Sequence, residues 1–144
     1  MTQFLQFLTN HWMLAATFAI LVVAYAINEW WTQKTGPGRL STQALVEQLN
    51  HNQAKLIDLR TLSDFNRGHI IHAMHIEHDK LADNINQLTA YKDKPVILVC
   101  GLGQKSLAAG RFLHKQGFLH VFYLVGGMSA WHSDNLPLEK GREE

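Results

Sequence analysis

The chain has 144 residues, of which 47% are hydrophobic and 17% charged, a size and composition that suit one ordinary domain and exclude a disordered chain. Thirteen Lys and Arg against twelve Asp and Glu give a formal net charge of +1, so the overall charge does not predict binding to nucleic acid. The single cysteine, Cys100, excludes an intramolecular disulfide and a zinc site built only from thiolates of one chain.

The first predicted element is an apolar helix near the N-terminus. No charged side chain occurs before residue 29, and residues 12–31 give about 30 Å of helix, which matches the hydrocarbon thickness of one bilayer. Lys34 and Arg39 follow this segment, so the positive-inside rule places the C-terminal part in the cytoplasm. Tryptophans at both ends of the segment fit the aromatic belts at headgroup depth (Trp12, Trp30 and Trp31). The sequence therefore predicts a single-pass membrane anchor over residues 12–31.

Two other interpretations of this segment stay open. A cleaved signal peptide would explain the apolar run and the small residues around Tyr25, although the usual basic start is missing. A buried core helix is the second alternative, although such helices are usually shorter. The segment Thr32–Leu40 contains Gly36, Pro37 and Gly38, a composition typical of a linker. We therefore expect an anchor and linker over residues 1–38 and a soluble domain over 39–144.

Short apolar strands alternate with helical patterns in this second part. Ser41 is a candidate N-cap for the first helix. Apolar runs predict strands at 55–59, 73–76, 95–100 and 121–125, and spacing predicts helices at 81–91, 106–116 and 128–133. The run PVILVC at 95–100 has no polar residue, as expected of a strand buried on both faces. The prediction is an α/β fold, with a small open parallel sheet covered by helices on both faces and preceded by the transmembrane helix.

Cys100 lies where chemistry is expected in such a fold, at the carboxyl end of the most apolar strand. Gly101 and Gly103 allow the following loop to turn several backbone N–H groups inward, and Lys105 adds a positive charge near the start of the next helix. These features favour a thiolate and form a cradle for an anionic group on its sulfur. The alternative is that Cys100 is a small core residue at a strand end. Residue patterns alone leave both interpretations open.

Four segments of the chain resemble the motifs of the rhodanese family, in the same order. CGLGQKS at 100–106 resembles its active-site loop C-x-x-G-x-R-S, and LIDLR at 56–60 resembles its D-x-R strand. DFNRGHIIHAMHI at 64–76 and LVGGMSAW at 124–131 resemble two further motifs, so the resemblance covers residues 40–138. An apolar helix ahead of one such domain is similar to small membrane-anchored bacterial proteins of this family. The resemblance therefore implies the inner membrane of a bacterium, with the domain on the cytoplasmic side.

The resemblance also implies a sulfurtransferase. Cys100 would carry sulfur as a persulfide, received from thiosulfate or another sulfane-sulfur donor and passed to a thiol, cyanide or a protein acceptor. Neither the residue patterns nor the resemblance predicts a metal, another cofactor or a nucleic-acid partner. The six-residue loop is associated in this family with sulfur substrates, whereas the related phosphatases have a longer loop. The substrate-binding residues would be the rest of the loop together with an arginine after the second strand (Gly101, Leu102, Gly103, Gln104, Lys105, Ser106 and Arg60).

Two departures from the family pattern bear on activity. Lys105 stands where Arg is common, which exchanges a planar bidentate group for a point charge. His72 stands where Gly is usual, so a different backbone conformation is expected there. A membrane-tethered binding or persulfide-sensing module with little turnover is therefore the second hypothesis. The spacing of His69, His72 and His75 does not match a helical metal-binding motif, so no metal site is predicted from it.

Overall fold

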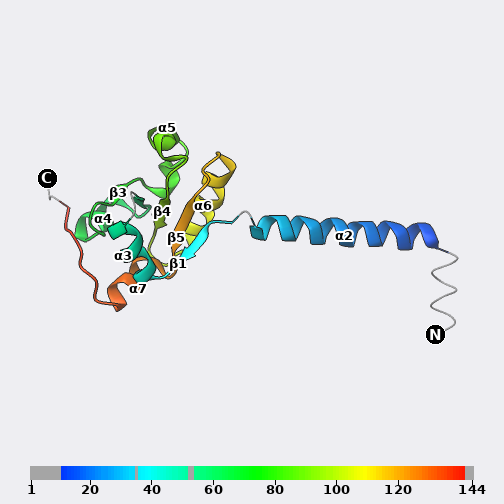
Figure 1. Cartoon of the computed structure of the whole chain (residues 1–144), viewed down its shortest axis with the longest axis horizontal. Coiled ribbons are helices and arrows are strands. Elements are labelled where there is room, and N and C mark those ends of the chain that lie inside the picture. The colour runs from blue at the N-terminus through cyan, green and yellow to red at the C-terminus, as the bar shows by residue number, and fades with distance from the viewer. Residues whose placement is uncertain (1–10, 35, 52–53, 142–144) are drawn as a thin grey trace. The chain divides into compact units, whose positions relative to one another are not determined.

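The structure is a computed structural model that describes residues 11–34, 36–51 and 54–141. The chain divides into two units, one ending at residue 35 and one beginning at Gly36 (Figure 1). The first unit contains helix α2 (Trp12–Lys34). The elements of the second follow in the order β1 (Gly38–Leu40), α3 (Thr42–His51), β2 (Lys55–Asp58), α4 (Leu62–Arg67), β3 (Met74–His75), η1 (His78–Lys80), α5 (Ile85–Leu88), η2 (Thr89–Tyr91), β4 (Val96–Val99), α6 (Gln104–Lys115), β5 (Val121–Leu124) and α7 (Gly127–Ser133).

Helix α2 forms over the segment where an apolar helix is predicted. Large apolar side chains along it are exposed, from Trp12 to Ile27. Among the described residues, no helix combines the length and the apolar character that crossing a membrane requires, so the predicted transmembrane span has no support from the structure. The side chains of residues 29–34 lie outside the described part, and the predicted aromatic belt at Trp30 and Trp31 stays a prediction.

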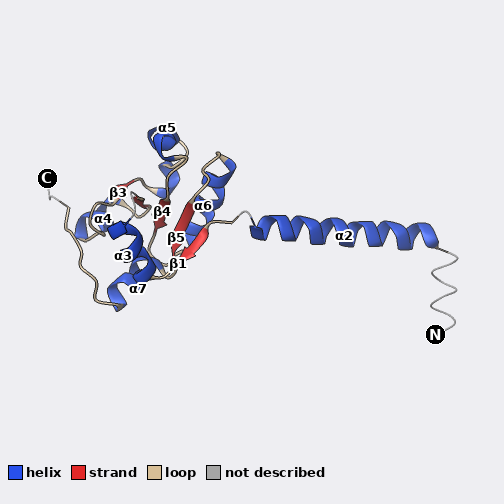
Figure 2. Cartoon of the chain, in the orientation of Figure 1, coloured by secondary structure: helices blue, strands red, loops and turns tan. Residues whose placement is uncertain are grey.

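The five strands of the second unit form one parallel sheet in the order β1-β5-β4-β2-β3 (Figure 2). Every pair of neighbouring strands is parallel, and β4 lies in the middle between β5 and β2. All four residues of β4 are buried, as its unbroken apolar sequence predicts. The predicted α/β fold with a small parallel sheet is confirmed, and the carboxyl end of its central strand leads directly into Cys100.

Two hydrophobic clusters cover the two faces of the sheet. On one face, α5 and α6 pack over Ile57, Val96 and Leu98 with Leu88, Leu113 and others. On the other face, α3 and α7 pack over Leu56, Ile97 and Val99 with Leu45, Met128 and Trp131. Successive residues of a strand point to opposite faces, which is why β4 supplies both clusters. Cys100 belongs to the first cluster, so its side chain points toward the side of the sheet that α6 covers.

The last part of the predicted linker, residues 36–40, belongs to the folded domain. Gly38–Leu40 form β1, which pairs with β5 at the edge of the sheet. Pro37 is buried against α6, where a Cβ added to Gly110 would lie 2.6 Å from its Cγ. The glycines and proline here permit close packing rather than free motion, because a side chain at Gly38 would collide with the ring of Phe122 at 2.4 Å.

Local turn chemistry divides the helix predicted over residues 81–91. The chain there forms turns, the single-turn α5 and the 3₁₀ helix η2. The side-chain amide of Asn84 donates to the carbonyl of Lys80 at 2.8 Å, which is a local alternative to continued helix. The other predicted helices and strands are present with small shifts at their ends, and Ser41 Oγ accepts from Ala44 N at 3.2 Å, which confirms the first N-cap.

Candidate active site

The sulfur of Cys100 sits in a cradle of backbone N–H groups. Cys100 follows β4 and is 3% exposed. Its Sγ accepts hydrogen bonds from the backbone N–H of Gly103 at 3.0 Å and of Ser106 at 3.4 Å. Gly103 belongs to the loop that follows Cys100, and Ser106 lies in the first turn of α6, into which this loop leads. Backbone N–H groups converging on one atom favour a negative charge there, so this geometry suits a thiolate or a sulfur-bound anion.

Gly103 allows the loop to close this tightly. Its φ of +94° lies in the left-handed region, and an added Cβ would lie 3.2 Å from the backbone nitrogen of Gly126. Gly103 is also the N-cap of α6, and the first N–H groups of the helix have no acceptor within it. The N-terminus of α6 therefore adds its partial positive charge to the cradle.

A second clamp fixes the loop from the side of α7. Met128 N donates to the carbonyl of Cys100 at 2.8 Å, and Ser129 N donates to that of Gly101 at 3.1 Å. Gly127 makes this approach possible, since a Cβ there would lie 2.2 Å from the Cys100 oxygen. The first N–H groups of α7 thus find their acceptors in the loop. Sequence reasoning missed this contact, although the glycine pair 126–127 signals a close backbone approach.

The remaining loop residues differ in exposure. Gly101, Gln104 and Lys105 are exposed, and Leu102 is 70% exposed. Ser106 is fully buried, and within the described part its hydroxyl has no hydrogen-bond partner. A buried hydroxyl without a hydrogen-bond partner is uncommon, and a ligand or a water at this position would satisfy it. The structure thus brings six of the predicted site residues together around Cys100 in one loop and helix turn.

Lys105 interacts electrostatically with a His–Asp pair on η1, in which His78 is half-buried and Asp79 is exposed. His78 Nδ1 lies 3.1 Å from Asp79 Oδ1. This hydrogen bond lowers the pKa of Asp79, and the positive charge of Lys105 lowers it further. The sequence gives no direct signal for this pair, because β3 and η1 approach the Cys100 loop only through the order of the strands.

Arg60 is a predicted site residue whose side chain bonds to Asp58 and Gly68 and not to the Cys100 loop. Its Nη2 lies 2.7 Å from Asp58 Oδ2 and donates to the carbonyl of Gly68 at 2.7 Å. Its Nε donates to the same carboxylate at 3.1 Å. This bidentate pair is mostly buried and ties the end of β2 to the turn after α4, in agreement with a structural role for the two residues. A contact of Arg60 with substrate stays a prediction.

The histidines of the segment after α4 have separate roles. His69 stacks on Phe65 with 3.7 Å between ring centroids and donates from Nδ1 to the carbonyl of Phe65 at 2.9 Å. His75 donates from Nε2 to the carbonyl of Arg60 at 2.8 Å. His72 adopts a φ of +64°, the left-handed conformation that glycine favours. The expected departure from the usual turn stays a prediction. Within the described ranges, no three potential metal ligands form a group.

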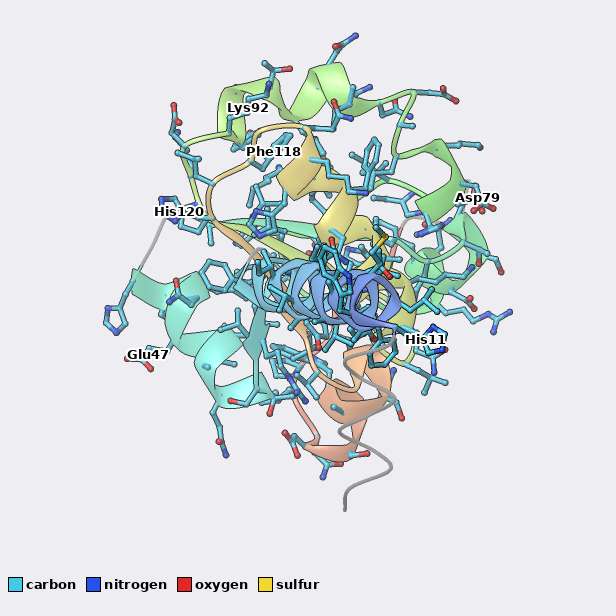
Figure 3. The ribbon with its side chains drawn as sticks, turned by 90° about the vertical axis from the view of Figure 1, so that its right-hand side faces the viewer. His11, Glu47, Asp79, Lys92, Phe118 and His120 are labelled. Atoms are coloured by element: carbon cyan, nitrogen blue, oxygen red, sulfur yellow. The ribbon has the colours of Figure 1, made fainter. Side chains whose placement is uncertain are left out.

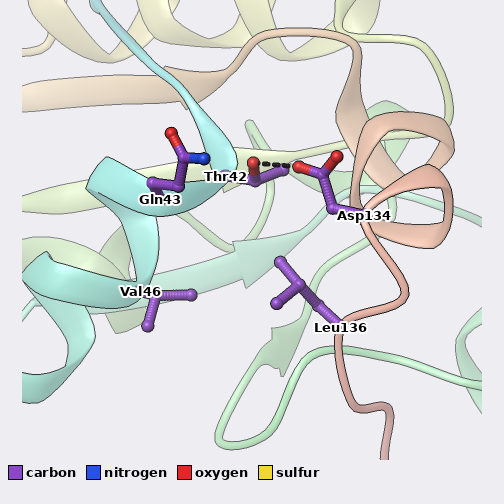
Figure 4. Close-up of a pocket in the computed structure, with 5 residues that line it drawn as sticks. All are labelled: Thr42, Gln43, Val46, Asp134 and Leu136. Carbon is purple, nitrogen blue, oxygen red and sulfur yellow. Dashed lines mark hydrogen bonds between the residues drawn. The ribbon is translucent and has the colours of Figure 1, made fainter.

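A shallow pocket of about 430 Å³ lies on the side of the sheet covered by α3 and α7 (Figure 4). Its walls include Val46 and Leu136, and the hydroxyl of Thr42 donates to the carboxylate of Asp134 beside them. None of its lining residues belongs to the Cys100 loop. The pocket is therefore distinct from the cradle and supplies no group to it.

Sequence comparison now identifies the family, because the profile of the rhodanese-like domain matches residues 41–134. The chain belongs to the rhodanese-like family. It is 31% identical to the uncharacterized protein YibN of Escherichia coli K12 over 143 residues, which cover 99% of this chain and all of YibN. It is 38% identical to the thiosulfate sulfurtransferase GlpE of Shewanella oneidensis over 96 residues, 67% of this chain and 93% of GlpE.

Solved structures agree with this assignment. The crystal structure of a rhodanese-like domain protein from Staphylococcus aureus aligns with a TM-score of 0.62 at 26% identity, covering 73% of this chain and 99% of that one. At the level of the family, the GlpE relatives support sulfurtransferase chemistry for this rhodanese-like domain.

Proposed function

We propose that this protein is a sulfurtransferase that moves sulfane sulfur from thiosulfate or a persulfide donor to a thiophilic acceptor through a persulfide on Cys100. The observation that carries the proposal is the cradle: two backbone N–H groups donate to the Cys100 sulfur at the carboxyl end of the central strand. A cysteine that only filled the core would not need its sulfur enclosed by a glycine loop and a helix N-terminus.

The reaction proceeds as a double displacement. The Cys100 thiolate attacks the outer sulfur of thiosulfate, and the sulfur–sulfur bond of the donor breaks with its electron pair leaving on sulfite. The enzyme then carries a Cys100 persulfide anion. Cyanide or a thiolate attacks the outer sulfur of that persulfide, so that thiocyanate or a new persulfide leaves and the Cys100 thiolate is restored. Neither step requires an added oxidant or reductant.

The loop supports each charged species in this sequence. The N–H groups of Gly103 and Ser106 face the sulfur in the resting protein, and the free N–H groups of the first turn of α6 are available to the outer sulfur. Lys105, exposed at the same helix turn, attracts the thiosulfate dianion. The buried hydroxyl of Ser106 is free to donate to the outer sulfur, which would satisfy it.

The test is sulfur transfer from thiosulfate to cyanide, compared between the wild-type chain and the Cys100→Ser variant. We expect turnover in the wild type only. Mass spectrometry after exposure to thiosulfate should show a gain of one sulfur atom on the wild-type chain and none on the variant. Melting curves of both proteins exclude a folding defect as the cause of lost activity.

The competing hypothesis, a binding or persulfide-sensing module, gives a different result in the same experiment. A sensor would take up one sulfur from a polysulfide donor on Cys100 but would turn over slowly with every acceptor. If Cys100 takes up no sulfur from thiosulfate or from polysulfide, the sulfurtransferase proposal fails.

We further propose that α2 attaches the protein to the cytoplasmic side of a bacterial inner membrane. Support comes from the exposed apolar side chains along α2 and from the absence of charge in residues 1–28 of the sequence. The basic residues Lys34 and Arg39 follow the apolar segment on its C-terminal side. Fractionation of cells that express the full chain should recover it with membranes, and a chain starting at Gly36 should lose most of this association.

A further inference from the structure

A basic surface lies where the strands of the sheet begin, at the end opposite to Cys100. All strands are parallel, so their first residues meet at one edge, whereas Cys100 follows the last residue of β4 at the other. Backbone hydrogen bonds connect the segments of this edge: Lys55 N donates to Pro95 O at 2.8 Å, and Leu119 N donates to Lys92 O at 3.1 Å. We define the basic edge by Lys55, Lys92, Lys94, Leu119 and His120.

Aromatic rings hold the three lysines of the basic edge in place. The ammonium groups of Lys55 and Lys94 lie 5.5 and 5.9 Å from the ring centre of Tyr91. The ammonium group of Lys92 lies 6.0 Å from the ring centre of Phe118. None of these lysines forms an ion pair within the part of the chain that the structure describes. The three ammonium groups therefore lie beside aromatic rings without an ion-pair partner, although the exposed Asp93, between Lys92 and Lys94 in the sequence, lowers the net charge of the edge.

An exposed leucine accompanies these charges. Leu119 is 63% exposed, although its neighbours Phe118 and Val121 are buried. Figure 3 shows Lys92, Phe118 and His120 on neighbouring segments at this end of the domain, with His120 joined to β4 through the bond from Val96 N to its carbonyl at 2.8 Å. One apolar side chain among unpaired lysines suits a partner with anionic groups above an apolar layer.

The chain itself leads from the apolar helix to this edge. Only Thr35 separates Lys34, the last residue of α2, from Gly36, and the next residue, Pro37, is already packed against α6. β1 then begins at the same edge of the sheet as Lys55 and Lys94. The covalent connection between α2 and the strand that begins at this edge is therefore only a few residues long.

We propose that the basic edge docks on the anionic headgroups of the membrane to which α2 attaches. The lysines contact headgroup phosphates, Leu119 enters the headgroup region, and the Cys100 loop, at the opposite edge of the sheet, stays open to donors and acceptors in solution. This inference rests on the proposed membrane attachment and is independent of the sulfur chemistry.

The alternative partners fit the basic edge less well. Single-stranded nucleic acid needs exposed aromatic faces for its bases, but Phe118 is buried and lysines cover Tyr91. A phosphorylated or acidic protein segment would favour the planar fork of arginine, whereas the three cations here are lysines. Lysine near an anionic membrane surface is an effective point charge.

The experiment uses residues 36–144 alone, so that α2 cannot contribute. This part should fold independently, because the described residues of both hydrophobic clusters lie between residues 40 and 138. Flotation with vesicles at low ionic strength compares phosphatidylcholine with phosphatidylglycerol. We expect binding only to phosphatidylglycerol, weakened by salt, and lowered about fivefold for each lysine removed. The triple variant Lys55→Gln, Lys92→Gln, Lys94→Gln should thus bind roughly a hundredfold more weakly.

A matched triple variant controls for net charge. Arg67→Gln, Lys80→Gln and Lys140→Gln remove the same charge outside the basic edge, and binding should change by less than about threefold, as expected for a long-range effect alone. Equal losses in both triple variants would overturn the proposal, since they would indicate attraction by net charge alone. Binding to an oligonucleotide or an acidic peptide but not to phosphatidylglycerol would also overturn it.

The full chain separates this inference from the attachment of α2. If the full chain binds phosphatidylcholine vesicles but residues 36–144 do not bind phosphatidylglycerol, α2 attaches the protein and the basic edge does not dock. If residues 36–144 bind phosphatidylglycerol but the full chain does not bind phosphatidylcholine, the basic edge binds anionic lipid, but attachment by α2 fails and the proposed docking beside α2 fails with it.

Discussion

At the residue scale, Lys105 is the position where this chain departs from the usual active-site loop of its family. Lys105 supplies a full charge beside the N-terminus of α6 but not the two parallel hydrogen bonds of a guanidinium. Lys105→Arg should therefore raise kcat/KM for thiosulfate several-fold, whereas Lys105→Gln should lower it about tenfold, because the field that attracts the dianion is lost. Steady-state sulfur transfer from thiosulfate to cyanide at low salt measures kcat/KM for the two variants and the wild type. Equal values for all three proteins would exclude a role for Lys105 in the capture of thiosulfate.

The negative charge of Asp79 partly cancels the positive charge of Lys105, with which it interacts. The hydrogen bond with His78 and the charge of Lys105 lower the pKa of Asp79, so its carboxylate stays ionised at neutral pH and some way into the acid range. Asp79→Asn should raise kcat/KM for thiosulfate about twofold at low salt, with a smaller gain at high salt. The two proteins should converge only as the pH falls below the lowered pKa of Asp79, where the wild type loses its negative charge. If the ratio of kcat/KM between Asp79→Asn and the wild type does not change with salt, the effect of the substitution is steric and not electrostatic.

His72 carries local backbone strain. It is exposed and has a φ of +64°, a conformation that costs a residue with a side chain about 1 kcal/mol relative to glycine. His72→Gly should therefore increase the free energy of unfolding by about 0.5–1 kcal/mol and raise Tm by a few degrees. His72→Ala is the matched control, because it keeps the strain and should give no gain. Thermal unfolding of the three proteins measures the difference, and a gain with alanine would mean that the imidazole itself is unfavourable.

At the element scale, the contact between α7 and the Cys100 loop determines the geometry of the cradle. A Cβ on Gly127 would lie 2.2 Å from the Cys100 carbonyl oxygen, so Gly127→Ala must displace the loop or α7 and break the bond from Met128 N. We expect a loss of about 2–4 kcal/mol of stability and at least a tenfold loss of sulfur transfer. Gly101→Ala is the stability control, since a Cβ there meets no atom within 4 Å. Similar melting temperatures for both variants would contradict the clamp.

The sequence predicted the elements whose signals are local. The apolar run of β4, the Ser41 cap and the glycine loop after Cys100 are each readable within a few residues, and the structure has all three. The edge strand β1 was missed because its three residues form a strand only through pairing with β5. The His78–Asp79 pair was missed for the same reason, since only the order of the strands brings it toward Lys105. Contacts between distant segments leave little trace in composition or periodicity.

At the scale of the whole molecule, the sulfur chemistry and the N-terminal helix belong to separate units of the chain. The cradle, the clamp from α7 and both hydrophobic clusters are all formed by residues after Gly36. The chemical site should therefore not need α2.

Residues 36–144 should accordingly transfer sulfur from thiosulfate to cyanide with a kcat/KM within about twofold of that of the full chain in detergent. Their melting temperature should also be close to that of the domain in the full chain, because the described residues of both clusters all lie after Gly36. With an acceptor that is itself bound to a membrane, the full chain should be faster, since attachment to the same surface raises the effective concentration of the two partners. A large loss of activity toward soluble thiosulfate and cyanide on removal of residues 1–35 would mean that the N-terminal unit contributes to the site.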